Sequence, residues 1–228
     1  MYYFKAFKAT SSLETCRKFR EGHKKVLLDY GISNITTNND DWMFYESVYG
    51  ITAEDERGEI VGGIRIHVAD DDHPLPVEEA IGEMDPKIFG LIRQYANSGT
   101  GELCGLWNAK SVAGIGISLL LIRAGISVVT QIQLNSLFTI CADYTMPMVK
   151  KVGFEVEDSL GNKGEFIYPN ENYIARVLRR MNAITLETAQ PEDRERILNL
   201  RNNPVQITSE HGPKGDISIN YNLIIANV

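Results

Sequence analysis

The stretch NAKSVAGIGISLLLIRAGISVVTQ, residues Asn108–Gln131, is the most apolar run of the 228-residue chain and contains two glycines, Gly114 and Gly116. A transmembrane helix needs about 20 consecutive apolar residues. This run carries Arg123 in its middle and is diluted by further glycines and serines. We therefore expect a helix that is buried in a globular core, and no membrane span.

The same run fits neither of the common nucleotide-binding loops. The Gly-x-Gly-x-x-Gly pattern needs a third glycine where Leu119 stands, and no Gly-Lys-Ser/Thr sequence is present. What remains is a strand over Glu102–Asn108 and a turn over 109–113. A helix then runs from near Gly114 to about Val129.

Two interpretations of the turn remain open. Glycines at a helix start let phosphate oxygens approach the free N–H groups of the first turn, where the helix dipole is positive. Alternatively, Gly114 and Gly116 only allow the helix to pack closely on the sheet.

Composition limits the class of protein and its partners. Apolar residues make up 43% and charged residues 23% of the chain, as in a globular protein. The formal net charge of −7 disfavours nucleic acid as a partner. Three cysteines without a zinc-ligand spacing indicate a reducing compartment and no metal site. No export signal is visible at the N-terminus, so we predict a cytoplasmic protein.

The remaining pattern alternates strands and helices, which predicts a mixed α/β sheet in one domain. Expected strands are 2–9, 42–52, 60–68, 134–142, 153–157, 165–168 and 216–225. Expected helices are 13–30, 77–98 with a break at Asp85-Pro86, 143–152 and 191–202. Expected loops are 33–41, 70–76 and 204–215. Residues 173–181 have helical spacing of apolar residues, although their composition also permits a strand.

Three segments together resemble the GNAT superfamily, the acyl-CoA N-acyltransferases. They are the strand Glu102–Asn108, the turn Ser111-Val-Ala-Gly114-Ile-Gly116, and Met148–Phe154 with its Gly-Phe ending. The resemblance implies that the turn binds pyrophosphate. The superfamily's turn opens with Arg or Gln where this chain has Ser111, so phosphate contact would depend on backbone N–H groups. It further implies a GNAT-like domain over 1–184, a strand at 173–181, and a C-terminal extension over 185–228.

A narrower resemblance is to the autoinducer (acyl-homoserine-lactone) synthases and the N-acyl amino acid synthases. Gly62-Gly-Ile-Arg65 is similar to their Gly-x-x-Arg strand ending, and Pro74-Leu-Pro76 to the loop that follows. Glu102-Leu-Cys-Gly-Leu106 is similar to their Glu-x-Ser-Arg-Leu, with Gly105 at the Arg position. Asp40 and Asp41 resemble the acidic patch that gathers the amine.

These resemblances imply an N-acyltransferase. It would move an acyl group from a phosphopantetheine thioester, either acyl-CoA or an acyl carrier protein, to the amine of a small molecule or amino acid. The donor site implied comprises Leu106, Trp107, Asn108, Ser111, Ala113, Gly114, Ile115 and Gly116. No metal is required.

Glu102 is the expected proton acceptor, because a carboxylate desolvated on a core strand has a raised pKa. A structural glutamate paired with Arg65 is the alternative. Arg65 would bind a substrate carboxylate or form an ion pair. Trp42 and Phe44 would line an acyl pocket or pack in the core.

Two further alternatives remain open. Many GNAT enzymes protonate the leaving thiolate with a Tyr at the position where this chain has Val149, and Tyr144 lies five residues upstream. The missing side chains therefore leave room for a GNAT-fold protein that has lost catalysis and binds a ligand or partner. Residues 185–228 could also form an arm that makes a homo-oligomer.

Overall fold

The computed structural model describes residues 1–32 and 39–226, so the predicted loop 33–41 lies largely outside the described residues. Ten strands of the described chain form one mixed, mostly antiparallel sheet, in the order β6-β8-β5-β4-β3-β2-β1-β10-β9 with β7 beside β8. The strands are β1 Tyr2–Lys8, β2 Val48–Glu54, β3 Ile60–Val68, β4 Thr100–Asn108, β5 Ser136–Ala142, β6 Glu155–Val156, β7 Glu165–Ile167, β8 Ile174–Arg180, β9 Val205–Gly212 and β10 Gly215–Asn222.

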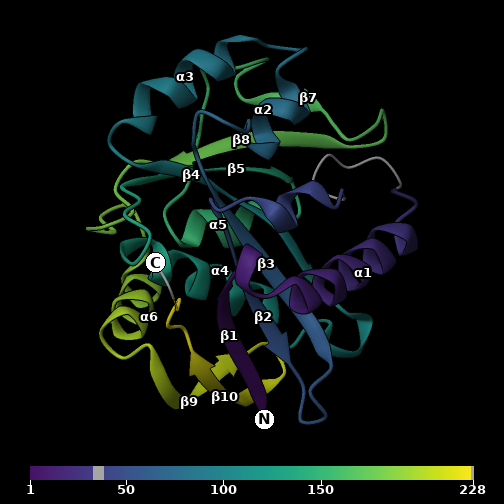
Figure 1. The fold of residues 1–228 in the computed structure, drawn as a ribbon, viewed down its shortest axis with the longest axis vertical. Helices are drawn as coiled ribbons and strands as arrows, with labels where there is room; N and C mark the ends of the chain where they lie inside the picture. Colours follow the sequence, from purple (N-terminus) through teal and green to yellow (C-terminus); the bar gives the residue numbers. More distant parts are fainter. Residues whose placement is uncertain (33–38, 227–228) are drawn as a thin grey trace.

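Helices cover both faces of this sheet (Figure 1). They are α1 Leu13–Asp29, α2 Pro76–Ile81, α3 Lys87–Ala96, α4 Ile117–Ser127, α5 Met146–Lys151 and α6 Pro191–Asn202. Helix α1 packs on one face of β3 and β4, and α4 packs on the other face against β2, β3 and β4. The two sides of β4 therefore belong to two different hydrophobic clusters.

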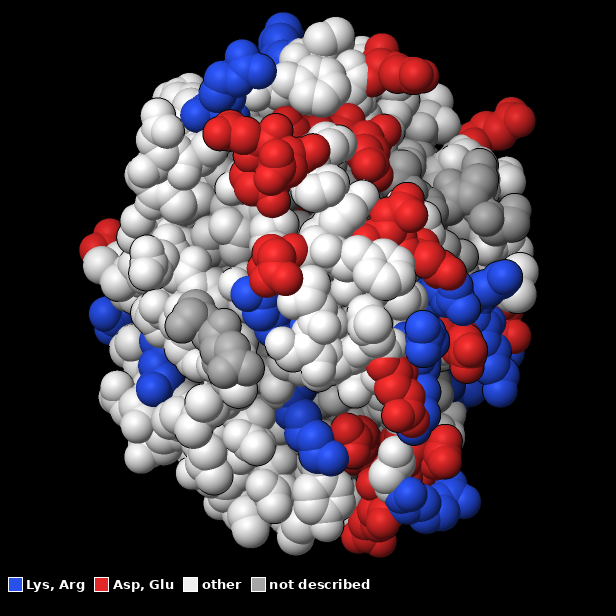
Figure 2. Space-filling model, in the orientation of Figure 1, with Lys and Arg blue, Asp and Glu red and all other residues white. Residues whose placement is uncertain are grey.

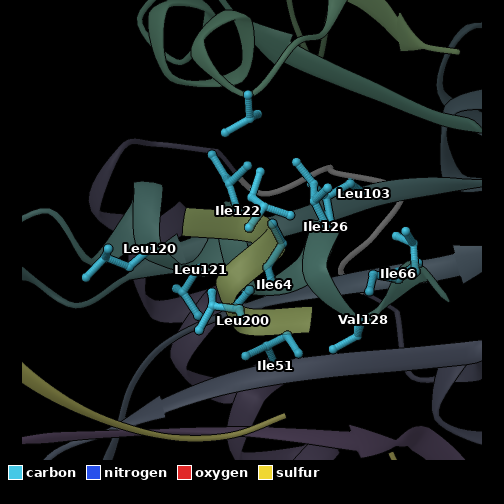
Figure 3. Packing of buried hydrophobic residues seen from close by; sticks show 14 of the residues in the cluster. Ile51, Ile64, Ile66, Leu103, Leu120, Leu121, Ile122, Ile126, Val128 and Leu200 are labelled. Carbon is cyan, nitrogen blue, oxygen red and sulfur yellow. The ribbon is translucent and has the colours of Figure 1, made fainter. Parts of the chain in front are cut away.

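Helix α4 is the centre of the larger cluster, as the apolar run predicts. Leu121, Ile122 and Ile126 are each at most 1% exposed and pack toward Ile64 and Leu103 of the sheet (Figure 3). A helix that is apolar on all sides is stable in water only when neighbours bury it on all sides. The sheet covers one side of α4, and α6 packs on another.

Arg123, the charged residue inside this run, is also buried. Its Nε donates to Asp193 Oδ1 of α6 at 2.7 Å, and its Nη1 lies 3.7 Å from Glu210 Oε2 of β9. Buried charges in proteins are generally paired, because desolvating an unpaired one is costly. The pairing shows how an arginine is accommodated in a core helix and fixes α4 to the C-terminal elements.

Several predicted elements are confirmed, among them the strand at 173–181 and the helix at 191–202. Three predictions are wrong. Residues Asp41–Phe44 form a 3-10 helix, and the following strand begins only at Val48. Helix α4 begins at Ile117, because Gly114 and Gly116 have positive φ angles of 75° and 102°, outside the helical region.

The third wrong prediction is the loop at 204–215, most of which is strand β9. Strand β10 lies parallel to β1, with Tyr2 opposite Ile219, and β9 pairs antiparallel with β10 at the sheet edge. Residues 205–222 thus extend the same sheet that contains β4, and they bring the β9–β10 turn close to the turn that precedes α4.

Among the residues that the structure describes, no helix has the length and apolarity needed to cross a bilayer. The same residues contain no group of three or more His, Cys, Asp or Glu side chains placed to hold a metal ion.

Candidate active site

Strands β4 and β5 separate along their length. They pair in parallel only where Thr100–Glu102 of β4 lies beside Ser136–Phe138 of β5. Beyond this point, β4 continues to Asn108 and β5 to Ala142 without pairing with each other. In the described part of the chain, the main-chain groups of β4 that face β5 after Glu102 therefore have no strand partner.

A β-bulge in β4 lies at the same level. Gly63 pairs with Trp107 and Arg65 with Cys104, so β4 has one residue more than β3 between these pairs. The bulge contains Gly105, whose φ of +58° lies in the left-handed region. A Cβ at this position would lie 2.9 Å from Arg65 Nε, so glycine is required for backbone conformation and for space.

A cavity of about 280 Å³ occupies the separation of the two strands. Residues of both strands line it, together with residues of α1, the first turn of α4, α5 and the segment 168–173. Most of this lining is apolar, with Val26, Leu27, Ile122 and Val149 among its side chains. Because α1 and α4 lie on opposite faces of the sheet, the cavity connects these two faces.

Glu102 lies on the wall of this cavity at the point where β4 and β5 part. Its side chain is 0% exposed, and Oε2 accepts a hydrogen bond from the Val77 N–H in the first turn of α2 at 2.6 Å. Oε1 is buried without a hydrogen-bond partner among the described residues. Burial raises the pKa of Glu102 to about 8, although the Val77 N–H and Arg65 oppose the shift.

Arg65 lies on the neighbouring strand β3, but its side chain does not line the cavity and packs against the rings of Trp42 and Phe19. It is 0% exposed, and its guanidinium stacks on the Trp42 ring at 4.2 Å. Burial lowers the pKa of Arg65, while Cys104 and Glu102 counteract this effect. Burial also lowers the pKa of His23, which lines the cavity, to about 3, so this imidazole is neutral.

The two aromatic residues expected at an acyl pocket lie elsewhere. Trp42 is buried beneath Arg65 and packs on Phe19, and Phe44 is 63% exposed. Neither belongs to the described residues that line the cavity, and neither does Arg65. The 3-10 conformation at 41–44 directs Trp42 into the hydrophobic cluster that includes Phe19 of α1; only the part of the expected strand 42–52 from Val48 onward is a strand.

The turn from 109 to 116 joins β4 to α4 next to the cavity. Ser118 Oγ donates to Asn108 Oδ1 at 2.5 Å, and both residues line the cavity. The Ala113 N–H donates to Lys110 O and is therefore engaged. The N–H groups of Gly114, Ile115 and Gly116 have no hydrogen-bond partner among the described residues. Leu106, Trp107 and Asn108 line the cavity, whereas the other predicted donor-site residues, Ser111, Ala113, Gly114, Ile115 and Gly116, do not.

Comparison with known proteins supports this architecture. The sequence matches no protein-family model and no curated protein. The structure is similar to FeeM, an N-acyl amino acid synthase from uncultured soil microbes, with a TM-score of 0.59 and 12% identity, covering 78% of this chain and 96% of that chain. It is also similar to an acyl-CoA N-acyltransferase from Pseudomonas aeruginosa, with a TM-score of 0.56 and 10% identity over 79% and 99% of the two chains.

A third similar structure is the CoA-dependent acyl-homoserine lactone synthase MesI, with a TM-score of 0.55 and 12% identity over 89% of this chain and 95% of that one. The chain has the GNAT fold. The predicted α/β fold of this superfamily is confirmed, and the structural similarity to the autoinducer and N-acyl amino acid synthases covers 78–89% of this chain.

Within the GNAT fold, some cavity residues were not singled out from the sequence. His23 and Leu27 come from α1, Tyr30 is the residue that caps its C-terminus, and Tyr168 and Tyr173 come from the segment after β7. The Tyr173 hydroxyl donates to Tyr30 O at 3.0 Å and joins these two distant segments at the cavity. Helical spacing places His23, Leu27 and Tyr30 on one side of α1, but nothing local in the sequence shows that this side faces an opening.

Proposed function

We propose that the protein is an N-acyltransferase that moves an acyl group from a phosphopantetheine thioester to the amine of a small molecule or amino acid. The observation that carries the proposal is the cavity between the parted strands β4 and β5, with the buried Glu102 on its wall. An extended pantetheine arm can pair with main-chain groups of β4 that have no strand partner. In this proposal the turn at 114–116 binds the phosphates at one end of the arm, and Glu102 faces the thioester at the other end.

Glu102 is the group proposed to accept the proton. Attack by the amine nitrogen forms the C–N bond of the product and breaks the C–S bond, with the electron pair leaving on the thiolate. The ammonium must first lose a proton, and Glu102 Oε1 is buried without a partner on the cavity wall. A general base works best when its pKa is near the working pH, and the pKa of Glu102 is about 8.

The amine is proposed to enter from the side of α2, where acidic side chains gather. Burial and the negative charges of Asp41, Glu79 and Asp70 raise the pKa of Tyr45. The charge of Glu79 also contributes to the raised pKa of Glu102. Figure 2 shows Asp and Glu side chains grouped in the region of α2 and its preceding loop, whereas Lys and Arg gather toward α1. Acidic clusters raise the local concentration of cations, so this surface favours an ammonium as the acceptor.

The thioester is proposed to arrive as acyl-CoA, because the donor turn offers N–H groups and a helix N-terminus for its phosphates. Two of the similar proteins are an acyl-CoA N-acyltransferase and the CoA-dependent synthase MesI, and FeeM is an N-acyl amino acid synthase. The buried, unpartnered carboxylate oxygen of Glu102 favours catalysis over ligand binding alone, because burying such a group costs stability.

The test is release of free thiol from acyl-CoAs of increasing chain length, with a panel of amino acids and small amines as acceptors. We expect acceptor-dependent thiol release in the wild type and a loss of about 100-fold or more in the Glu102→Gln variant. The Glu157→Gln variant is the matched control, because Glu157 is a buried carboxylate that pairs with Arg179 away from the cavity. Undiminished turnover in Glu102→Gln would rule out the proposed base. No CoA binding and no thiol release in the wild type would rule out the function.

A further inference from the structure

The β9–β10 turn lies directly on the glycine turn that precedes α4. Lys214 Nζ donates to Ala113 O at 2.9 Å. Its Cε and Nζ lie 3.2 and 3.3 Å from the position that a Cβ on Gly114 would occupy. Pro213 Cδ lies 3.3 Å from the corresponding position on Gly116. A segment about 100 residues distant in sequence thus brings an ammonium group to the turn.

The electrostatics of this turn favour an anion. The N–H groups of Gly114, Ile115 and Gly116 have no partner among the described residues, and they precede the N-terminus of the eleven-residue helix α4. Lys110 also lies in this turn, but its Nζ faces Asp29 at 3.1 Å. Lys214 forms no ion pair with any described acidic residue. Its bond to Ala113 O uses one of three N–H donors and leaves two for oxygen atoms of a ligand.

A second feature of the same cavity indicates a ligand independently of the turn. Asn108 and Ser118 line the cavity beside the turn, and Glu102 lines it at the point where the strands part. The Glu102 side chain is 0% exposed, and its Oε1 has no partner among the described residues. A buried polar atom on a cavity wall is costly unless something that enters the cavity satisfies it. The cavity that holds this unsatisfied carboxyl oxygen is lined by Asn108 and Ser118, which flank the cationic turn in the sequence.

We propose that Lys214 binds the pyrophosphate of the acyl donor, together with the N–H groups of residues 114–116. This inference rests on the proposed function and adds a residue to its donor site. From the sequence we expected only backbone N–H groups to contact the phosphates, because the first position of the turn is Ser111 and not Arg or Gln. The C-terminal hairpin supplies the charge instead, from a position that no local motif contains.

The packing of the hairpin fixes where this charge lies. A Cβ on Gly212 would clash with the carbonyl oxygen of Ile115, so the two turns are in close backbone contact. Strands β9 and β10 pair along their whole length, from Val205 opposite Asn222 to Gly212 opposite Gly215. Strand β10 in turn pairs with β1. Because β10 is paired in the sheet and Lys214 Nζ donates to Ala113 O, the ammonium group is held beside residues 114–116 before the donor binds.

The experiment compares binding of CoA, which carries phosphates, with binding of pantetheine, which carries none. Isothermal titration calorimetry is performed on wild type, Lys214→Gln, Lys214→Arg and the control Lys24→Gln. Lys24 is an exposed lysine of α1, so Lys24→Gln removes the same charge at a distant place on the surface. We expect Lys214→Gln to weaken CoA binding by about tenfold, which is typical of a charge-assisted hydrogen bond. Pantetheine binding should change by less than about twofold, and Lys214→Arg should restore CoA binding.

The other outcomes separate the two proposals. If Lys214→Gln weakens CoA and pantetheine equally, Lys214 only holds the hairpin and the inference is wrong. If Lys214→Gln binds CoA as tightly as the wild type, the inference is also wrong, while the donor site stands. If the Lys24→Gln control weakens CoA binding as much, the effect is one of net charge and the inference fails. If the wild type binds neither ligand, the proposed function fails as well.

Discussion

The raised pKa of Glu102 predicts an unusual dependence of stability on pH, which the Glu102→Gln variant isolates. A carboxyl group has an ordinary pKa of 4.5 when it is exposed in the unfolded chain, and the pKa of Glu102 in the fold is about 8. Between these values the folded state holds a proton that the unfolded state has lost. The stability that this proton contributes is fully present below pH 4.5 and is lost as the pH rises through 8.

The expected size follows from the two pKa values. One pKa unit corresponds to about 1.4 kcal/mol. At pH 5 the wild type has lost about 1 kcal/mol and at pH 9 nearly 5 kcal/mol, so the loss between them is about 4 kcal/mol. Gln resembles the protonated carboxyl group in shape, and its oxygen can still accept from the Val77 N–H. Glu102→Gln should therefore be more stable than the wild type by only about 1 kcal/mol at pH 5 and by nearly 5 kcal/mol at pH 9.

The assay is urea denaturation of both proteins at pH 5, 7 and 9, with the difference in free energy of unfolding plotted against pH. All other ionisable groups are common to the two proteins and cancel in this difference. The Glu157→Gln control should show no gain at pH 9, because it leaves Arg179 without the carboxylate that lies 3.0 Å away. A difference between Glu102→Gln and wild type that stays constant from pH 5 to 9 would refute the buried, protonated state of Glu102.

Two further predictions concern the scaffold of the site. Gly105→Ala should lower the free energy of unfolding by about 1–3 kcal/mol, because alanine at φ +58° is strained and its Cβ meets Arg65. Gly90→Ala is its control on an open helix surface and should stabilise by up to about 1 kcal/mol; equal effects in urea denaturation would contradict the argument. Arg123→Met should cost about 3–5 kcal/mol by leaving Asp193 buried and unpaired, and a loss below about 1 kcal/mol would show that the pair is solvated.

The sequence predicts well those features that depend on local pattern. The apolar run after Asn108 predicts a buried helix, and the glycines ahead of it predict a turn, because both signals lie within a few residues. The start of α4 is three residues later than predicted because the same glycines adopt left-handed conformations that a helix excludes. Glu102 was singled out as a desolvated carboxyl group, and the structure places it fully buried.

The remaining features depend on contacts between distant segments. Strand β9 was predicted as a loop, although Val205 and Ile207 alternate with polar residues as in a strand; in the structure these two apolar side chains are exposed. The strand is held by backbone pairing with β10, a contact with another segment that the pattern within 205–212 does not identify. Trp42 is not part of a strand, because its ring packs against the Arg65 guanidinium. No pattern in either segment indicates this contact between Trp42 and Arg65. The contact of Lys214 with the turn before α4 could not be predicted for the same reason, because the two segments are about 100 residues apart in the sequence.

The bulge at Gly105 explains why these distant features meet in one place. One extra residue in β4 changes which face its last side chains occupy, so Leu103 packs with α4 whereas Trp107 packs with α1. The same extra residue leaves room for the Arg65 guanidinium and lies where β4 no longer pairs with β5. A bulge also increases local twist, which turns the end of β4 away from its neighbour. The separation of β4 from β5 and the position of the glycine turn after β4 are therefore linked consequences of one irregularity in one strand.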